Sequence, residues 1–279
     1  MEKGLTLVIS LYNKLPAIKN TLDSVLNNHG NYPFKCIIVD DDSTDGCSNI
    51  AEAYDICYPD IFTYVKIKHH GPKHPANARN FGIKLAETEY LAFLDGDNEL
   101  CPGFIDRGCN FLDENPQYAL YGNGHKGKFI KTIGNNPNQW FNTKETVYNL
   151  GKYRKEGKFE INSWLEYLNC GWENVHWSAN IFKTNLVKQN LFTDCYGEDS
   201  VFKLKYIYKN PHIFIDNTTC ESIIFNSQYS QSQAWGNRRT KEGSYIYEMF
   251  KTIEKEIPDF IYEIKTDENN NISLIKKSE

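Results

Sequence analysis

An alternation of apolar runs and helical segments over the first 97 residues constrains the fold of this chain most. Three short runs have the length and composition of buried strands, and a fourth, residues 62–67, alternates like a strand. They span residues 5–11, 34–39, 62–67 and 90–94. The segments between them carry apolar side chains at helical spacing, at residues 16–27, 45–54 and 74–88. Strands that alternate with helices in this way predict an α/β fold, an open and mostly parallel sheet flanked by helices.

Polar side chains follow three of these predicted strands. Tyr12 follows the first, acidic residues 40–42 follow the second, and Asp95 and Asp97 follow the fourth. Ligands of parallel sheets bind at the carboxyl ends of the strands, where these groups should gather. A buried Asp41 can accept the imide N–H of a uracil, and the ring of Tyr12 can stack on the base. Two carboxylates spaced Asp-x-Asp can share a divalent cation, although such a pair by itself is more often part of a capped loop.

The pattern loosens after residue 120. Residues 122–160 are rich in Gly, Asn and Lys, which indicates a loop or an irregular region with an antiparallel strand or two. Further on, the sequence predicts short elements and one longer C-terminal helix. The helices are expected at 161–167, 199–208 and 243–264, and the strands at 177–182 and 212–215. Polar residues 267–279 are expected to fray.

Composition narrows the functional classes. A net charge of −5 and a pI near 5.9 argue against a nucleic-acid partner, which needs a basic footprint. The eight cysteines form no Cys-x-x-Cys pair, so we expect reduced, mostly buried thiols. His69, His70 and His74 lack a supporting Cys or Asp pattern, which favours a surface or ligand-facing loop over a zinc site. We find no secretory signal and no transmembrane segment, and we predict a cytoplasmic protein.

Five motifs follow one another in a recognisable order. Residues 7–13 read Leu-Val-Ile-Ser-Leu-Tyr-Asn, 39–45 Val-Asp-Asp-Asp-Ser-Thr-Asp, 76–82 Ala-Asn-Ala-Arg-Asn-Phe-Gly, 90–98 Tyr-Leu-Ala-Phe-Leu-Asp-Gly-Asp-Asn, and 197–199 Gly-Glu-Asp. In this order they resemble the motifs of family 2 inverting glycosyltransferases, which are nucleotide-diphospho-sugar transferases with the GT-A fold. The resemblance covers residues 5–232. Asp42 stands where the family usually has Gly.

The resemblance implies a role for each matching residue. For the donor, it implies binding by Ser10, Tyr12, Asp41, Arg79, Asp95 and Gly96. Asp95 and Asp97 would hold Mn²⁺ or Mg²⁺, and Asp199 would be the catalytic base. For the acceptor or sugar pocket, it points less specifically to Trp172, Trp177, Ser178, Glu198 and Trp235.

The function implied is metal-dependent, inverting transfer of a sugar from a nucleotide-diphosphate donor, with a UDP-sugar expected. The acceptor hydroxyl would be on a saccharide, a lipid-linked or a protein-linked glycan, in glycan or cell-surface polysaccharide synthesis. The domain division implied is one catalytic domain, 1–235, with a nucleotide-sugar half (1–121) and an acceptor half (122–235), followed by a helical extension (236–279). Association with the inner face of the membrane and the oligomeric state stay open.

One departure from the family pattern supports an alternative. Asn226 stands where many members have His or Arg near the phosphates or metal, and an amide brings no charge to a phosphate. The alternative is a catalytically weak GT-A module that binds sugar nucleotide or glycan and assists a partner enzyme.

Overall fold

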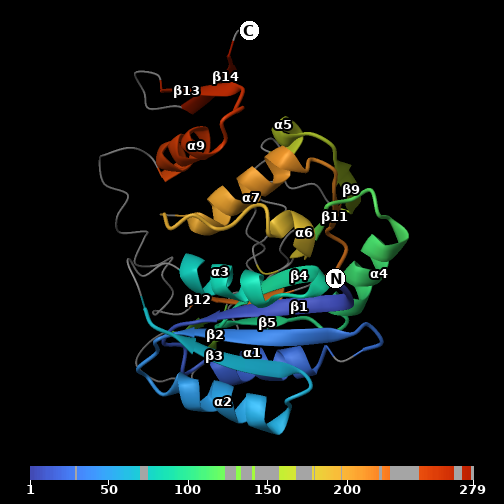
Figure 1. The fold of residues 1–279 in the computed structure, drawn as a ribbon, viewed down its shortest axis with the longest axis vertical. Coiled ribbons are helices and arrows are strands. Elements are labelled where there is room, and N and C mark those ends of the chain that lie inside the picture. Colours follow the sequence, from blue (N-terminus) through green and yellow to red (C-terminus); the bar gives the residue numbers. More distant parts are fainter. Residues whose placement is uncertain are drawn as a thin grey trace.

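An eight-stranded sheet runs through the molecule, as Figure 1 shows for this computed structural model. The structure describes residues 1–28, 30–69, 75–122, 130–132, 140–141, 157–167, 178, 180–195, 197–219, 222–226, 245–266 and 272–277. In sheet order the strands are β3 (Phe62–Ile67), β2 (Phe34–Asp41), β1 (Glu2–Leu11), β4 (Thr88–Asp95), β10 (Asn180–Lys183), β6 (Leu120–Gly122), β11 (Ile213–Asp216) and β9 (Lys158–Ile161). The first four are parallel, whereas β10 is antiparallel to β4 and β6. The predicted mostly parallel α/β sheet is therefore confirmed.

Helices cover both faces of this sheet (Figure 1). On one face lie α1 (Ile18–Leu26), α2 (Cys47–Cys57) and α4 (Phe104–Glu114). On the other lie α3 (Ala76–Leu85), α6 (Thr184–Val187) and α7 (Glu198–Lys209). Along β1, Leu7 and Ile9 enter the first core and Val8 enters the second, because successive strand residues point to opposite faces.

Smaller elements complete the described part of the chain. A second sheet has the order β5 (Asn98–Leu100), β12 (Ser222–Asn226), β7 (Ile130–Thr132) and β8 (Trp140–Phe141). β7 and β8 are antiparallel, as predicted for the irregular region. Helix α5 (Trp164–Glu166) precedes β10, and α9 (Tyr245–Glu256) packs against α7. No helix among the described residues is long and apolar enough to cross a bilayer.

The prediction for the C-terminus was wrong in part. Helix α9 ends at Glu256, eight residues before the predicted end, and β13 (Tyr262–Thr266) pairs antiparallel with β14 (Ile272–Lys276). Pro258 explains the early end, because proline has no backbone N–H and disfavours helical backbone at the residue before it. The tail that was expected to fray thus contributes a strand. The domain boundary at residue 235 lies outside the described residues and stays a prediction.

The helix predicted at 161–167 begins later than predicted. Residues Lys158–Ile161 form β9, and helix α5 starts at Trp164, with Tyr167 still in helical backbone conformation. Phe159 and Ile161 are buried while Lys158 and Glu160 are exposed, which is the alternation of a strand with one covered face. The partner that fixes this strand is β11, about 50 residues further along the chain.

Candidate active site

The predicted site residues gather at the carboxyl edge of the parallel strands. Ser10 on β1 lies opposite Asp95 on β4, and Leu11 lies opposite Asp40 on β2. The Oγ atom of Ser10 is 3.5 Å from Oδ1 of Asp95. The acidic segments that follow β2 and β4 therefore flank the end of β1, as expected for this topology.

Arg79 links this edge to the beginning of α7. Its Nη2 donates to Asp95 Oδ1 at 2.8 Å and its Nη1 to Glu198 Oε1 at 2.7 Å. Burial would lower the pKa of Arg79, but the charges of Asp95 and Glu198 outweigh burial and raise it. Gly82, one turn later, brings α3 against β1, because a Cβ there would lie 2.3 Å from Val8 Cγ1. The glycine of this motif thus allows the arginine to reach the sheet edge.

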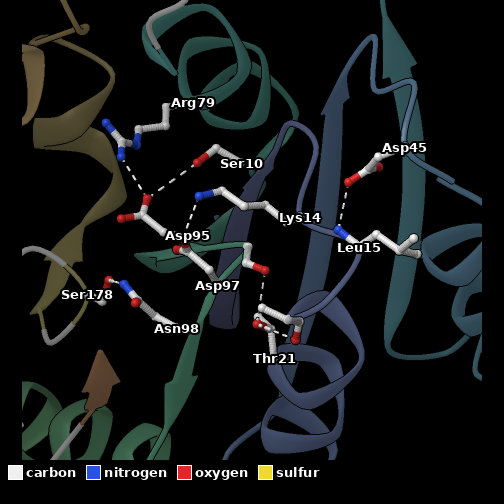
Figure 2. A network of polar contacts seen from close by, with 12 residues as sticks. Ser10, Lys14, Leu15, Thr21, Asp45, Arg79, Asp95, Asp97, Asn98 and Ser178 are labelled. Atoms are coloured by element: carbon white, nitrogen blue, oxygen red, sulfur yellow. Dashed lines mark hydrogen bonds and ion pairs between the residues drawn. The ribbon is translucent and has the colours of Figure 1, made fainter. Parts of the chain in front are cut away.

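Asp97 already has a cation beside it. The Nζ atom of Lys14, from the loop after β1, forms an ion pair with Oδ2 of Asp97 (Figure 2). The side chains of Lys14 and Asp97 are 19% and 10% exposed. Burial raises the pKa of Asp97; Lys14 opposes this shift and the nearby charge of Asp95 adds to it. Asp97 therefore gains from any positive charge at this position.

Asp95 and Asp97 fit a divalent cation that is shared with a ligand. Both offer hard carboxylate oxygens, and the ammonium of Lys14 shows that a cation is accommodated beside Asp97. Within the described ranges, no group of three or more His, Cys, Asp or Glu side chains could hold a metal by itself. Mg²⁺ in nucleotide sites is commonly held by one or two carboxylates with substrate phosphates and water, which matches this arrangement.

Gly96 keeps the two carboxylates at this spacing. Its N–H donates to the carbonyl of Ser10 at 3.2 Å, and its carbonyl accepts from Thr21 Oγ1 at 3.2 Å. A Cβ at this position would lie 3.2 Å from Leu11 Cδ1 and 3.3 Å from the carbonyl oxygen of Ser10. The backbone of Gly96 is thus anchored inside the protein, and a side chain there would press on β1.

Tyr12, Asp41 and His69 form a second group at the same edge. His69 Nδ1 lies 2.7 Å from Asp41 Oδ2, and its ring stacks on that of Tyr12 with centroids 5.6 Å apart and planes 25° apart. Oδ1 of Asp41 is buried and has no hydrogen-bond partner among the groups that the structure describes. A buried carboxylate oxygen is costly to leave unpaired, so Oδ1 indicates a place for a ligand N–H.

Asp40 and Asp42, on either side of Asp41, have structural roles. Asp40 accepts hydrogen bonds from the backbone N–H of Ser43 at 2.8 Å, from Tyr64 at 2.7 Å and from Ser48. Burial would raise the pKa of Asp40, but these hydrogen bonds outweigh burial and lower it. Asp42 has a φ of 62°, a left-handed conformation that Asp tolerates better than most residues. This backbone explains why a glycine is usual at position 42.

The first turn of α7 carries the predicted catalytic base. Asp199 Oδ1 accepts the N–H of Ser200 at 2.7 Å, beside the positive end of the helix dipole. The adjacent Glu198 is buried and turned to Arg79. Burial raises the pKa of Glu198 to about 7, against the opposing effect of Arg79. Asp199 also contributes to the raised pKa values of Glu198 and Arg79, so the three charges lie close together.

The acceptor residues are only partly described. Ser178 is buried and its Oγ accepts from Asn98 Nδ2 at 2.9 Å, next to Asp97 (Figure 2). Trp172, Trp177 and Trp235 lie outside the described residues, as do His70, His74 and the side chain of Asn226. From the sequence, Lys14 had no predicted role, and His69 was expected only in a surface or ligand-facing loop. Lys14 could have been found, because the loop after β1 must lie beside the loop after the neighbouring β4.

Comparison with known proteins defines the class of this molecule. The profile described as glycosyl transferase family 2 matches residues 6–168, which is more than half of the chain. The chain therefore belongs to glycosyl transferase family 2. The uncharacterised glycosyltransferase YibD of Escherichia coli is 33% identical over 264 residues, covering 90% of this chain and 70% of that protein. Other curated relatives are much longer, and the chain matches 22% or less of the length of three of them.

Solved structures show that the fold is GT-A. The structure of S. aureus TarS residues 1–349 in complex with UDP-GlcNAc has a TM-score of 0.65 at 20% identity, over 92% of this chain and 67% of that one. The mannosyltransferase PcManGT of Pyrobaculum calidifontis, in complex with GDP-Man and Mn²⁺, has a TM-score of 0.57 at 16% identity, over 91% of this chain and 68% of that one.

Proposed function

We propose that this chain transfers a sugar from a nucleoside diphosphate donor, with UDP as the expected nucleotide, to an acceptor hydroxyl. The proposal rests on the environment of the two carboxylate oxygens of Asp41. One of its oxygens is held by His69, and the other is buried without a hydrogen-bond donor among the described groups. An oxygen that only accepts complements the ring N–H of uracil or guanine and repels the bare ring nitrogen of cytosine or adenine. The UDP-GlcNAc complex of TarS supports uracil.

Each residue at the sheet edge then has a task. Tyr12 stacks on the base, Ser10 and Asp95 contact the ribose, and Arg79 braces Asp95. Asp95 and Asp97 would hold Mn²⁺ or Mg²⁺, which when bound would neutralise charge on the departing diphosphate. The Mn²⁺ in the complex of PcManGT supports this use of a metal.

The reaction is a single displacement with inversion. Asp199 takes the proton of the acceptor hydroxyl while the acceptor oxygen attacks the anomeric carbon. The bond from that carbon to the diphosphate oxygen breaks on the opposite face, and the nucleoside diphosphate leaves with the electron pair. Glu198 is committed to Arg79, so Asp199 is the carboxylate of this turn that is assigned to proton transfer.

The acceptor is proposed as a saccharide, lipid-linked or protein-linked glycan in polysaccharide synthesis. Ser178 and the three tryptophans Trp172, Trp177 and Trp235 are proposed to line its pocket. The second candidate function is a module that binds sugar nucleotide or glycan without turnover. Asn226, where family members carry His or Arg, is the feature that favours it.

A panel of UDP- and GDP-sugars, read out as released nucleotide, tests this function. We expect release of UDP with Mn²⁺, abolition by EDTA, and a loss of about 10³-fold in Asp97→Ala. Asp60→Asn, at an exposed carboxylate after α2, should match the unmodified chain. Tight binding of UDP with no release from any sugar nucleotide would contradict the enzyme and support the binding module.

A further inference from the structure

Hydrogen bonds hold the backbone of the loop after β1, whereas the side chain of Lys14 in this loop is able to change its partner. Asn13 Oδ1 accepts the N–H of Thr44 at 2.8 Å, and the N–H of Leu15 donates to Asp45 Oδ2 at 2.8 Å. The carbonyl of Lys14 accepts the N–H groups of Ala17 and Ile18, both at 2.9 Å. The backbone on either side of Lys14 is therefore tied to the loop after β2 and to the start of α1.

The side chain of Lys14 extends along Gly96 to reach the acidic pair. A Cβ on Gly96 would lie 3.4 Å from Lys14 Cγ, an ordinary contact distance, so the stem of Lys14 packs along the backbone of Gly96. The path ends at Oδ2 of Asp97, which is the carboxylate assigned to the metal. Figure 2 shows the amino group of Lys14 pointing toward the carboxylate of Asp97.

A lysine ammonium and a divalent cation exclude one another at this place. They compete for the same oxygen, and two positive charges held at one carboxylate repel each other. A diphosphate changes the balance, because its oxygens attract both the metal and a compact point charge such as an ammonium. Lysine has a flexible stem, so its head can change partner while its backbone stays in place.

We infer that Lys14 competes with the divalent cation for Asp97, and that a nucleoside diphosphate relieves this competition by taking over the ammonium. Metal and donor then bind together instead of independently, and Lys14 is a positioning residue for the diphosphate. The inference rests on the proposed function and adds a coupling between its two ligands. Such coupling is reciprocal, so nucleotide and metal must raise each other's affinity by the same factor.

Calorimetric titration of Mn²⁺ into the folded protein, with and without UDP, tests the inference directly. For the unmodified chain we expect weak binding of Mn²⁺ alone and affinity on the order of ten-fold or more higher with UDP. In Lys14→Met, which keeps the length of the stem, Mn²⁺ alone should bind on the order of ten-fold more tightly. The same variant should lose most of the enhancement by UDP.

Two variants serve as controls. Lys14→Arg keeps the charge and should retain the coupling. Lys19→Met removes an exposed lysine that pairs with Asp23 on α1, and it should behave like the unmodified chain. Circular dichroism and melting temperatures establish that each variant is folded.

Three results would separate failure of the inference from failure of the proposed function. Equal Mn²⁺ affinity of Lys14→Met and the unmodified chain without UDP would overturn the inference alone. If UDP binds without Mn²⁺ and Lys14→Met loses UDP, Lys14 replaces the metal, which also overturns it. If neither Mn²⁺ nor any sugar nucleotide binds the unmodified chain, the proposed function itself fails.

Discussion

The acidic segments after β2 and β4 look alike in sequence, but Asp40 and Asp41 are held by different kinds of partner from Asp95 and Asp97. Asp40 and Asp41 receive hydrogen bonds from the amide, hydroxyl and imidazole groups of Ser43, Ser48, Tyr64 and His69. Asp95 and Asp97 instead face the cations Arg79 and Lys14. The first segment suits the uncharged base of the proposed donor, and the second suits the phosphates and divalent cation of that proposal. Carboxylates at one sheet edge thus differ in role according to the partners they receive from neighbouring elements.

Removal of Arg79 should produce the largest effect, because Arg79 is the cation that faces Asp95 and also pairs with the buried Glu198. Arg79→Met leaves Glu198 buried without its counter-charge, and the free energy of unfolding should fall by about 3–5 kcal/mol. Urea denaturation at about pH 8, where Glu198 is mostly ionised, measures this loss. The double variant Arg79→Met/Glu198→Met should recover a large part of it. A loss below about 1 kcal/mol in the single variant would show that this pair matters little to stability.

Asp40→Asn tests the structural carboxylate of the first segment. The amide nitrogen would face groups that donate hydrogen bonds to Asp40, namely Ser43, Ser48 and Tyr64. We expect the free energy of unfolding to fall by about 1–3 kcal/mol, measured by urea denaturation. Asp42→Asn, at the exposed neighbour, keeps a residue type that accepts the left-handed backbone and should change stability little. Equal stability of the two variants would contradict the role of Asp40.

The site residues that were predicted from the sequence lie in local motifs, whereas those that were missed depend on tertiary contacts. Asp41, Arg79, Asp95 and Asp97 belong to local motifs, and the four parallel strands are short apolar or alternating runs, so a short window of sequence reveals them. Strand β9 owes its conformation to β11, and the partners Lys14 and His69 depend on which strands are neighbours. Register and pairing are tertiary properties, which explains why the motifs were found and the contacts between them were not.

Asp41→Asn contrasts with Asp40→Asn, since it changes the contact proposed for the ligand instead of a structural one. Oδ1 of Asp41 accepts no hydrogen bond from the described part of the chain. The free energy of unfolding of Asp41→Asn should therefore differ from that of the unmodified chain by less than about 0.5 kcal/mol. Loss of a charged acceptor for the base N–H should weaken UDP binding by about ten-fold or more, measured by calorimetry. Binding of CDP should weaken less, because an amide can donate to its bare ring nitrogen. A uniform loss for UDP and CDP would exclude Asp41 as the group that reads the base.

The smallest expected effect is a pH dependence of stability that arises from Glu198, the ion-pair partner of Arg79. Burial raises the pKa of Glu198 to about 7 in the folded chain, above the ordinary 4.5 of a glutamate. The folded state therefore holds the proton more tightly than the unfolded state does. This contribution to stability is complete below pH ~4.5 and is lost as the pH rises through ~7. The free energy of unfolding should thus fall by on the order of 1 kcal/mol between about pH 5.5 and 8, relative to Glu198→Gln. Parallel pH profiles for the two proteins would show that Arg79 keeps Glu198 ionised throughout. In that case Arg79 and Glu198 would form a permanent ion pair. The charges around Asp95 would then change as little with pH as the hydrogen bonds around Asp40.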